Sequence, residues 1–143
     1  MIRTLKTKDS DTGGFGIEIN QQSIYAKGVV WLPVSLLADP TNREKIFRLI
    51  QKLADTHINM IRVWGGGTYE DDHFYNLCDQ LGILVWQDFM FASACYPDYE
   101  GFIDLVGREA QAVILRLRNH PCIAVWSGNS HIDRLCQDRK SVV

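Results

Sequence analysis

The sequence has little excess of charge of either sign. Its 15 lysines and arginines and its 17 aspartates and glutamates give a formal net charge of −2 at pH 7, and the two signs are interspersed along the chain. Proteins that bind nucleic acid through its phosphates carry a basic patch or stripe. The even distribution of charge therefore argues against a nucleic-acid partner.

Long hydrophobic runs are also missing. No stretch approaches the roughly 20 apolar residues that span a bilayer, and the basic N-terminal segment 1–8 lacks the apolar run and the small-residue cleavage site of a secretory signal. With 46% hydrophobic and 22% charged residues, the composition is that of an ordinary soluble domain with one modest core. We therefore expect a cytoplasmic protein with no membrane partner.

Paired cysteines and clustered histidines are absent as well. The chain has neither a CxxC pair nor two histidines at metal-ligand spacing, and two of its cysteines lie within apolar runs, which favours buried reduced thiols. The phosphate-binding patterns GxGxxG and GxxxxGK(S/T) do not occur. The sequence therefore predicts neither a metal site nor a cofactor.

What the chain does contain is an alternation of strand-length apolar stretches and helix-length amphipathic stretches. The expected strands cover 15–19, 23–27, 28–32, 57–64, 83–86 and 122–126, and the expected helices cover 41–54, 72–81 and 101–118. The first two strands are expected to form a hairpin. Residues 1–14 are polar and end in a turn signal. We therefore expect 1–14 to be a linker or the end of a preceding domain, with order beginning near Phe15 and residues 15–143 belonging to a single domain.

The later strands are apolar throughout rather than on one face. A parallel sheet covered by helices requires such strands, so the chain is predicted to be an α/β protein. A doubly wound sheet and a piece of a (β/α)8 barrel share this alternation, and the local pattern leaves both open. In either fold, functional groups collect at the carboxyl ends of the strands.

All four tryptophans fall at the carboxyl ends of expected strands. These ends carry Trp31, Arg62 and Trp64 before a run of three glycines, Trp86 with Asp88, and Trp126 with Asn129. Aromatic side chains with amide and carboxylate neighbours suit sugar faces and hydroxyl groups better than nucleotides. The strand ends therefore favour a carbohydrate ligand.

Several longer strings are distinctive. They are Gly16–Asn20, Ala26–Gly28 with Trp31–Pro33, Asn59–Gly67, Tyr69–Asp72, Phe74–Asp79, Leu81–Ala92, and His120–Pro121 with Trp126–Asn129. Together they resemble the barrel domain of β-mannosidases of the glycoside hydrolase family 2 type, in the clan of β-galactosidase and β-glucuronidase, over nearly all of residues 15–135. The resemblance implies about four βα units of a (β/α)8 barrel preceded by a short β-hairpin. It also implies retaining hydrolysis of terminal β-mannose from mannose-containing oligosaccharides.

The resemblance assigns roles to four strand-end residues. Trp64 is similar to the tryptophan that lines the sugar subsite, and Arg62 is similar to the arginine that orients the nucleophilic carboxylate. Asp88 resembles an active-site acid, and Trp31 a substrate-binding tryptophan. Three of them also have a structural alternative, since Trp31 can equally fill the core, Arg62 can be a structural ion-pair partner, and Asp88 can cap a helix or loop.

The sequence departs from the family pattern near its end. Asn129, Ser130 and His131 stand where the family usually shows Asn-Asn-Glu, so His131 occupies the position of the general acid and base, and Ser130 that of the asparagine that binds the sugar 2-hydroxyl. Ser35 replaces a third family residue, an aspartate. A retaining glycosidase needs two carboxyl groups about 5–5.5 Å apart. Histidine can transfer protons near neutral pH, but the family nucleophile comes from a later strand, so we expect this chain alone to lack hydrolytic activity.

Length adds a second expectation. A complete barrel takes about 250 residues, and an open half leaves strand edges and an apolar inner layer uncovered. This predicts association with the missing half of the barrel or self-association. Two hypotheses remain open, a β-mannosidase-like glycoside hydrolase and a non-catalytic relic or carbohydrate-binding fragment.

Overall fold

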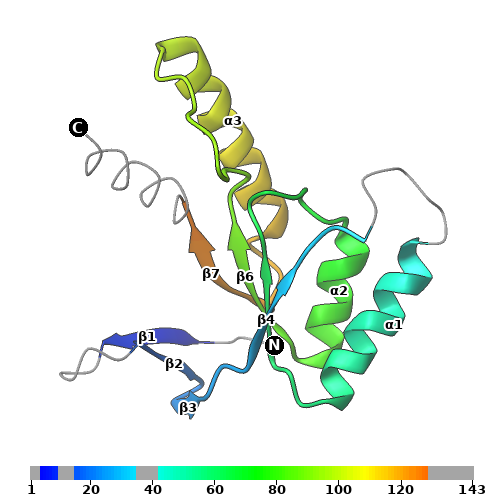
Figure 1. The fold of residues 1–143 in the computed structure, drawn as a ribbon. Coiled ribbons are helices and arrows are strands. Elements are labelled where there is room, and N and C mark those ends of the chain that lie inside the picture. Colours follow the sequence, from blue (N-terminus) through cyan, green and yellow to red (C-terminus); the bar gives the residue numbers. More distant parts are fainter. Residues whose placement is uncertain (1–3, 10–14, 35–41, 129–143) are drawn as a thin grey trace, which may run out of the picture.

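The computed structural model describes residues 4–9, 15–34 and 42–128, which form two sheets and three helices (Figure 1). The antiparallel sheet has strands β1 (Leu5–Asp9), β2 (Phe15–Ile19) and β3 (Gln22–Ile24). The parallel sheet has strands β4 (Gly28–Trp31), β5 (Met60–Val63), β6 (Leu84–Asp88) and β7 (Ile123–Ser127). The helices are α1 (Asn42–Asp55), α2 (Asp72–Leu81) and α3 (Glu100–Leu117). The predicted α/β class is confirmed.

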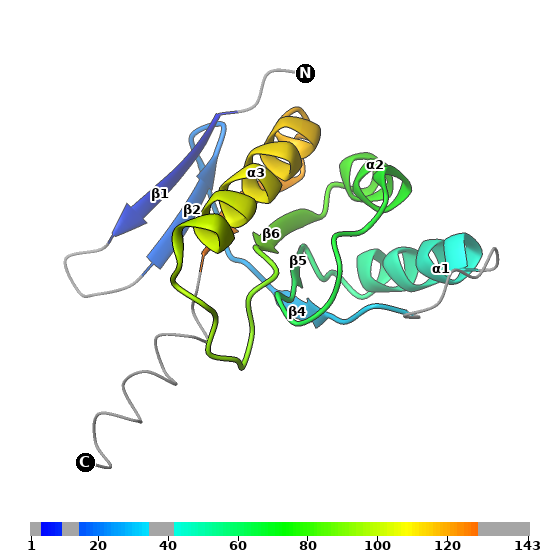
Figure 2. The ribbon, with the colours of Figure 1, turned by 90° about the horizontal axis from the view of Figure 1, so that it is seen from above.

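The four parallel strands lie side by side in the order in which they occur along the chain. Figure 2 shows α1 and α2 on one side of strands β4 to β6 and strands β1 and β2 on the other. Val113 and Leu117 of α3 belong to the same core as the side chains of α1 and α2. A doubly wound sheet changes the direction of its strand order at a switch point. The described strands contain no such reversal, so their order differs from that of a doubly wound sheet.

The two faces of the parallel sheet pack against different partners. Ile61, Val63 and Val85 face the helices and form the main core with side chains such as Phe74 of α2. On the other face, Met60 and Leu84 pack against Ile17 of the hairpin, with Leu5, Ile19, Trp86 and Ala124 around them. Strands β5 and β6 therefore bury apolar side chains on both faces, which explains their continuous apolar sequence.

The predicted hairpin is present and is followed directly by β4. Ile17 of β2 pairs with Ile24 of β3, and the two turn residues Asn20 and Gln21 have φ values of 50° and 68°. Positive φ at both turn positions is the geometry that matches the twist of two antiparallel strands. The hairpin therefore places Ile17 over the parallel sheet.

Order begins earlier than the sequence led us to expect. Residues Leu5–Asp9 form β1, and Leu5 pairs with Ile19 and packs at the edge of the Ile17 cluster. The expectation of order only from Phe15 was wrong because pairing with β2 satisfies the backbone of a segment that has little apolar pattern of its own.

Local signals set the ends of the helices and of the next strand. The Asp71 side chain accepts a hydrogen bond from Phe74 N at 3.2 Å at the start of α2, and Gly82 ends this helix with a φ of 70°. Thr41, the expected first residue of the capping box before α1, lies outside the described residues. His57 has a φ of 61° and lies in the turn after α1, so β5 starts later than predicted.

Within the residues that the structure describes, no helix combines the length and apolar character needed to cross a membrane.

Candidate functional site

An ion pair between Arg62 of β5 and Asp88 of β6 lies at the carboxyl end of the parallel sheet. Arg62 Nε is 3.1 and 3.0 Å from Asp88 Oδ1 and Oδ2, and Arg62 Nη2 is 2.8 Å from Oδ2. Asp88 is 5% exposed. A planar guanidinium that holds a carboxylate through two of its nitrogens is among the stronger and more directional polar contacts in proteins. The parallel register of β5 and β6 therefore joins two of the residues that the sequence predicted for the site.

The glycine run after β5 completes the surroundings of Asp88. Gly65 N donates a hydrogen bond to Asp88 Oδ2 at 3.2 Å. A Cβ atom at Gly65 would lie 2.5 Å from Phe89 O and 2.9 Å from Phe91 O. Glycine is therefore needed at Gly65 because two backbone segments approach too closely for any side chain.

Trp64 is half-buried and lies on the same turn. The ring carbons of Trp64 would be 2.2 to 2.5 Å from a Cβ atom placed on Gly66, so the indole covers that glycine. Gly67 is equally crowded, because a Cβ there would lie 2.8 Å from the ring of Pro33. The glycines thus allow the predicted sugar-contacting tryptophan to fold back over its own turn.

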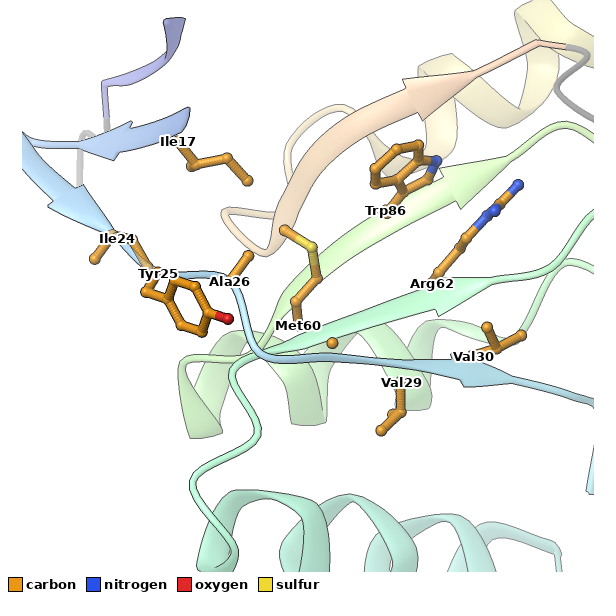
Figure 3. Close-up of a pocket in the computed structure, with 10 residues that line it drawn as sticks. Ile17, Ile24, Tyr25, Ala26, Val29, Val30, Met60, Arg62 and Trp86 are labelled. Atoms are coloured by element: carbon orange, nitrogen blue, oxygen red, sulfur yellow. The ribbon is translucent and has the colours of Figure 1, made fainter. Parts of the chain in front are cut away.

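Arg62 also contacts Trp86 on the face of the sheet that points toward the hairpin. The Arg62 Cζ atom is 5.3 Å from the centroid of the Trp86 ring, within the range of a cation–π contact. Both side chains line a cavity of about 390 Å³ together with Met60 and with Ile17 and Tyr25 from the hairpin side (Figure 3). The buried Trp86 Nε1 has no hydrogen-bond partner among the described residues.

Trp31, predicted to contact substrate or fill the core, is a core residue in the structure. It is 6% exposed, its ring centroid is 5.0 Å from that of Phe74, and its Nε1 donates to Glu70 Oε1 at 2.8 Å. Burial raises the pKa of Glu70 above its usual range, and the hydrogen bond from Trp31 opposes that shift. This environment favours the structural alternative for Trp31.

Four further residues that the sequence singled out do not belong to the described part of the chain. Asn129, Ser130 and His131 lie outside the described residues, and so does Ser35. Their roles stay predictions.

One group in the described residues has metal-ligand side-chain types, but its contacts favour a structural role. Asp79 Oδ2 is 2.7 Å from His120 Nδ1, and Asp79 Oδ1 accepts a hydrogen bond from Cys122 N at 2.7 Å. Burial, followed by the hydrogen bond to Asp79, raises the pKa of the Cys122 thiol far above its usual range. Both oxygens of the Asp79 carboxylate are thus already hydrogen-bonded, and the group ties the turn before β7 to α2.

A buried polar contact beneath Asp88 was not evident from the sequence. Tyr75 OH donates to Gln87 Oε1 at 2.7 Å, and Gln87 Nε2 donates to Asp88 O at 2.8 Å. Both side chains are 0% exposed. The only signal in the sequence was an amide residue in an otherwise apolar strand, and that signal does not reveal its partner.

Comparison with known proteins identifies relatives of this chain. No protein-family model matches it. It is 47% identical to a β-mannosidase of Rattus norvegicus over 116 residues, which cover 81% of this chain and 13% of that protein. It is 42% identical to β-mannosidase B of Thermothelomyces thermophilus, covering 81% of this chain and 14% of that protein. The chain therefore spans about one seventh of the length of these curated relatives.

The solved structures that resemble this chain include another β-mannosidase. The crystal structure of a β-D-mannosidase from Dictyoglomus thermophilum matches with a TM-score of 0.82 and 48% identity, over 90% of this chain and 16% of that one. A β-glucuronidase from Bacteroides uniformis matches with a TM-score of 0.77 at 21% identity, over 96% of this chain and 16% of that one, a likeness of fold alone.

Proposed function

The aligned part of this chain belongs to the β-mannosidase family, and from this we propose that the Arg62–Asp88 end of its parallel sheet is the sugar-binding part of a glycosidase active site. The activity proposed for the whole protein is removal of terminal β-mannose from mannose-containing oligosaccharides with retention of configuration. The observation that carries the proposal is the ion pair between Arg62 and the buried Asp88 at the carboxyl end of the strands, where barrel enzymes bind substrate.

We also propose that β4 to β7 are four consecutive strands of a (β/α)8 barrel. Sequential parallel order and helices on one face support this architecture. The face that carries Met60, Arg62 and Trp86 would then be the barrel interior, and the hairpin would close its amino-terminal end.

The contacts of Asp88 favour binding and orientation over nucleophilic attack. Both of its oxygens accept hydrogen bonds from Arg62, and one also accepts from Gly65 N. A carboxylate stabilised in this way is a weak nucleophile but a good acceptor for a sugar hydroxyl. We therefore assign Asp88 to hydroxyl recognition and Arg62 to holding it in place.

The alternative is a carbohydrate-binding fragment without hydrolysis. It rests on His131 at the position of the family acid and base, and on a nucleophile expected from a later strand. Hydrolysis of a nitrophenyl β-mannoside separates the two functions. Turnover that His131→Ala abolishes would exclude the non-catalytic alternative, whereas no turnover even with His131→Glu would exclude an active enzyme on this chain alone.

Mannose binding tests the site itself. We expect mannose to shift the backbone amide resonances of residues near Asp88, and Asp88→Asn to weaken that binding at least about tenfold because a charged acceptor is lost. Asp104→Asn, on an exposed position of α3, is the matched control and should bind normally. Glucose, which differs from mannose at C2, tests stereochemical preference. Equal mannose binding by the wild type and Asp88→Asn would refute the proposed site.

A further inference from the structure

Gln87 is a fully buried amide at the end of a strand that is otherwise apolar on the same face. It is 0% exposed, and its neighbour Val85 belongs to the main core between sheet and helices. Burying an amide costs free energy unless its polar atoms are hydrogen-bonded. The contacts of Gln87 therefore explain why an amide is tolerated there.

Those contacts connect α2 to the backbone of the proposed site. Tyr75 of α2 donates its hydroxyl proton to Gln87 Oε1 at 2.7 Å, and Gln87 Nε2 donates to the carbonyl oxygen of Asp88 at 2.8 Å. The Tyr75 ring is also fixed, because it packs edge-on against Phe74 at 5.1 Å and lies 5.7 Å from the guanidinium of Arg116. A rigid helix side chain thus holds the last peptide group of β6.

Burial raises the pKa of the Tyr75 phenol far above its usual range. The hydroxyl therefore remains protonated at neutral pH and can donate to Gln87.

Asp88 is held on both sides of the strand. Its carbonyl accepts from Gln87 on the helix side, and its carboxylate accepts from Arg62 and Gly65 N on the other. This strand end has little room to move, because Phe89 O lies so close to Gly65 that a Cβ atom would not fit between them. A change in the direction of the Asp88 carbonyl would therefore move its carboxylate and the guanidinium bound to it.

We propose that Tyr75 and Gln87 are positioning residues that fix the peptide group of Asp88 and thereby set the geometry of the Arg62–Asp88 pair. The inference deepens the proposed function and rests on it for its relevance to sugar binding. Neither residue touches the cavity, so both act through Asp88 alone.

The test follows the Arg62 Nε–H proton by nitrogen–proton correlation NMR of the isotopically labelled full chain, without sugar. Arg62→Lys and Asp88→Asn identify the signal. In Tyr75→Phe we expect exchange of this proton with solvent to accelerate at least about tenfold, because Gln87 loses the bond that holds its amide against the Asp88 carbonyl. Tyr69→Phe is the matched control, since it removes a half-buried hydroxyl that bonds Glu109 and Met90 N but not Gln87.

Gln87→Glu distinguishes a positioning role from a general effect on stability, because it makes exchange of the Arg62 Nε proton depend on pH. An ionised glutamate can accept from Tyr75 but cannot donate to the Asp88 carbonyl, whereas the protonated acid can do both. Burial raises the pKa of a carboxyl at this position. Protection of the Arg62 proton should therefore be present below that raised pKa and be lost as pH rises through it in this variant, while the wild type measured in parallel keeps it throughout.

Two results would overturn the proposal. One is unchanged exchange of the Arg62 proton in Tyr75→Phe. The other is equal acceleration of backbone amides throughout the chain, which would assign both residues to general stability. Because no sugar is present, failure of mannose binding would refute the proposed function and leave this result unaffected.

Discussion

Replacing Arg62 by methionine tests the central ion pair, because it removes the guanidinium and keeps an unbranched side chain. Removal of one partner from a fully buried pair costs about 3–5 kcal/mol, since the other charge remains buried. Asp88 is nearly inaccessible, but the Arg62 side chain is 27% exposed, and Gly65 N still donates to the carboxylate. We therefore expect Arg62→Met to lower the free energy of unfolding by about 2–3 kcal/mol.

A double-mutant cycle separates this penalty from lost packing. Asp88→Asn removes the charge that Arg62→Met would leave unpaired, so the double variant should be more stable than the sum of the single losses predicts, by about 1–2 kcal/mol. Urea unfolding followed by circular dichroism at neutral pH measures all four proteins. A coupling energy near zero would refute the reasoning, because the guanidinium would then contribute through packing alone.

Three further substitutions or measurements test other parts of the structure. Gly65→Ala should lose about 1–3 kcal/mol of stability in the same urea assay because its Cβ would meet backbone oxygens, whereas Gly107→Ala, in open space on α3, should gain about 0.5–1 kcal/mol. A thiol reagent should label exposed Cys95 at once and Cys78 only on unfolding, since burial raises the pKa of Cys78 to about 12. Rapid labelling of Cys78 in the folded chain would contradict its burial. A carboxyl group with a raised pKa in the folded state stabilises the fold below its unfolded pKa, and this contribution is lost as pH rises through the folded pKa. Glu70→Gln should therefore be more stable than the wild type at neutral pH, and the difference in unfolding free energy should shrink on acidification. A difference that stays constant with pH would refute this.

The elements with strong local signals were predicted well. The α2 helix has acidic residues at its start and Gly82 after its last turn, and both its ends were found at the expected residues. The hairpin and the apolar strands β5 and β6 were equally evident, since their patterns depend on side chains within the same segment. Such information is present in the sequence because it does not depend on what packs against the element.

The sequence left features wrong or open where a distant partner decides the structure. Residues Leu5–Asp9 have little apolar pattern, but β2 offers them a strand to pair with. Trp31 stands at a strand end like the other tryptophans, but the pleat of β4 directs its side chain toward the helices and Glu70. Which face a strand-end side chain occupies depends on register, and register is set by tertiary pairing.

The features of the proposed site likewise fall into those that the sequence determines and those that depend on tertiary packing. The sequence by itself determined the alternation of strands and helices, the resemblance to β-mannosidases, and the choice of Arg62 and Asp88 as candidates. Only the tertiary structure decided that these two side chains meet, that Gly65 must be glycine, and that Tyr75 reaches Gln87 beneath them. The physical reason is that propensity and hydrophobic pattern act within a few residues, whereas hydrogen-bond partners are chosen by how strands and helices pack against one another.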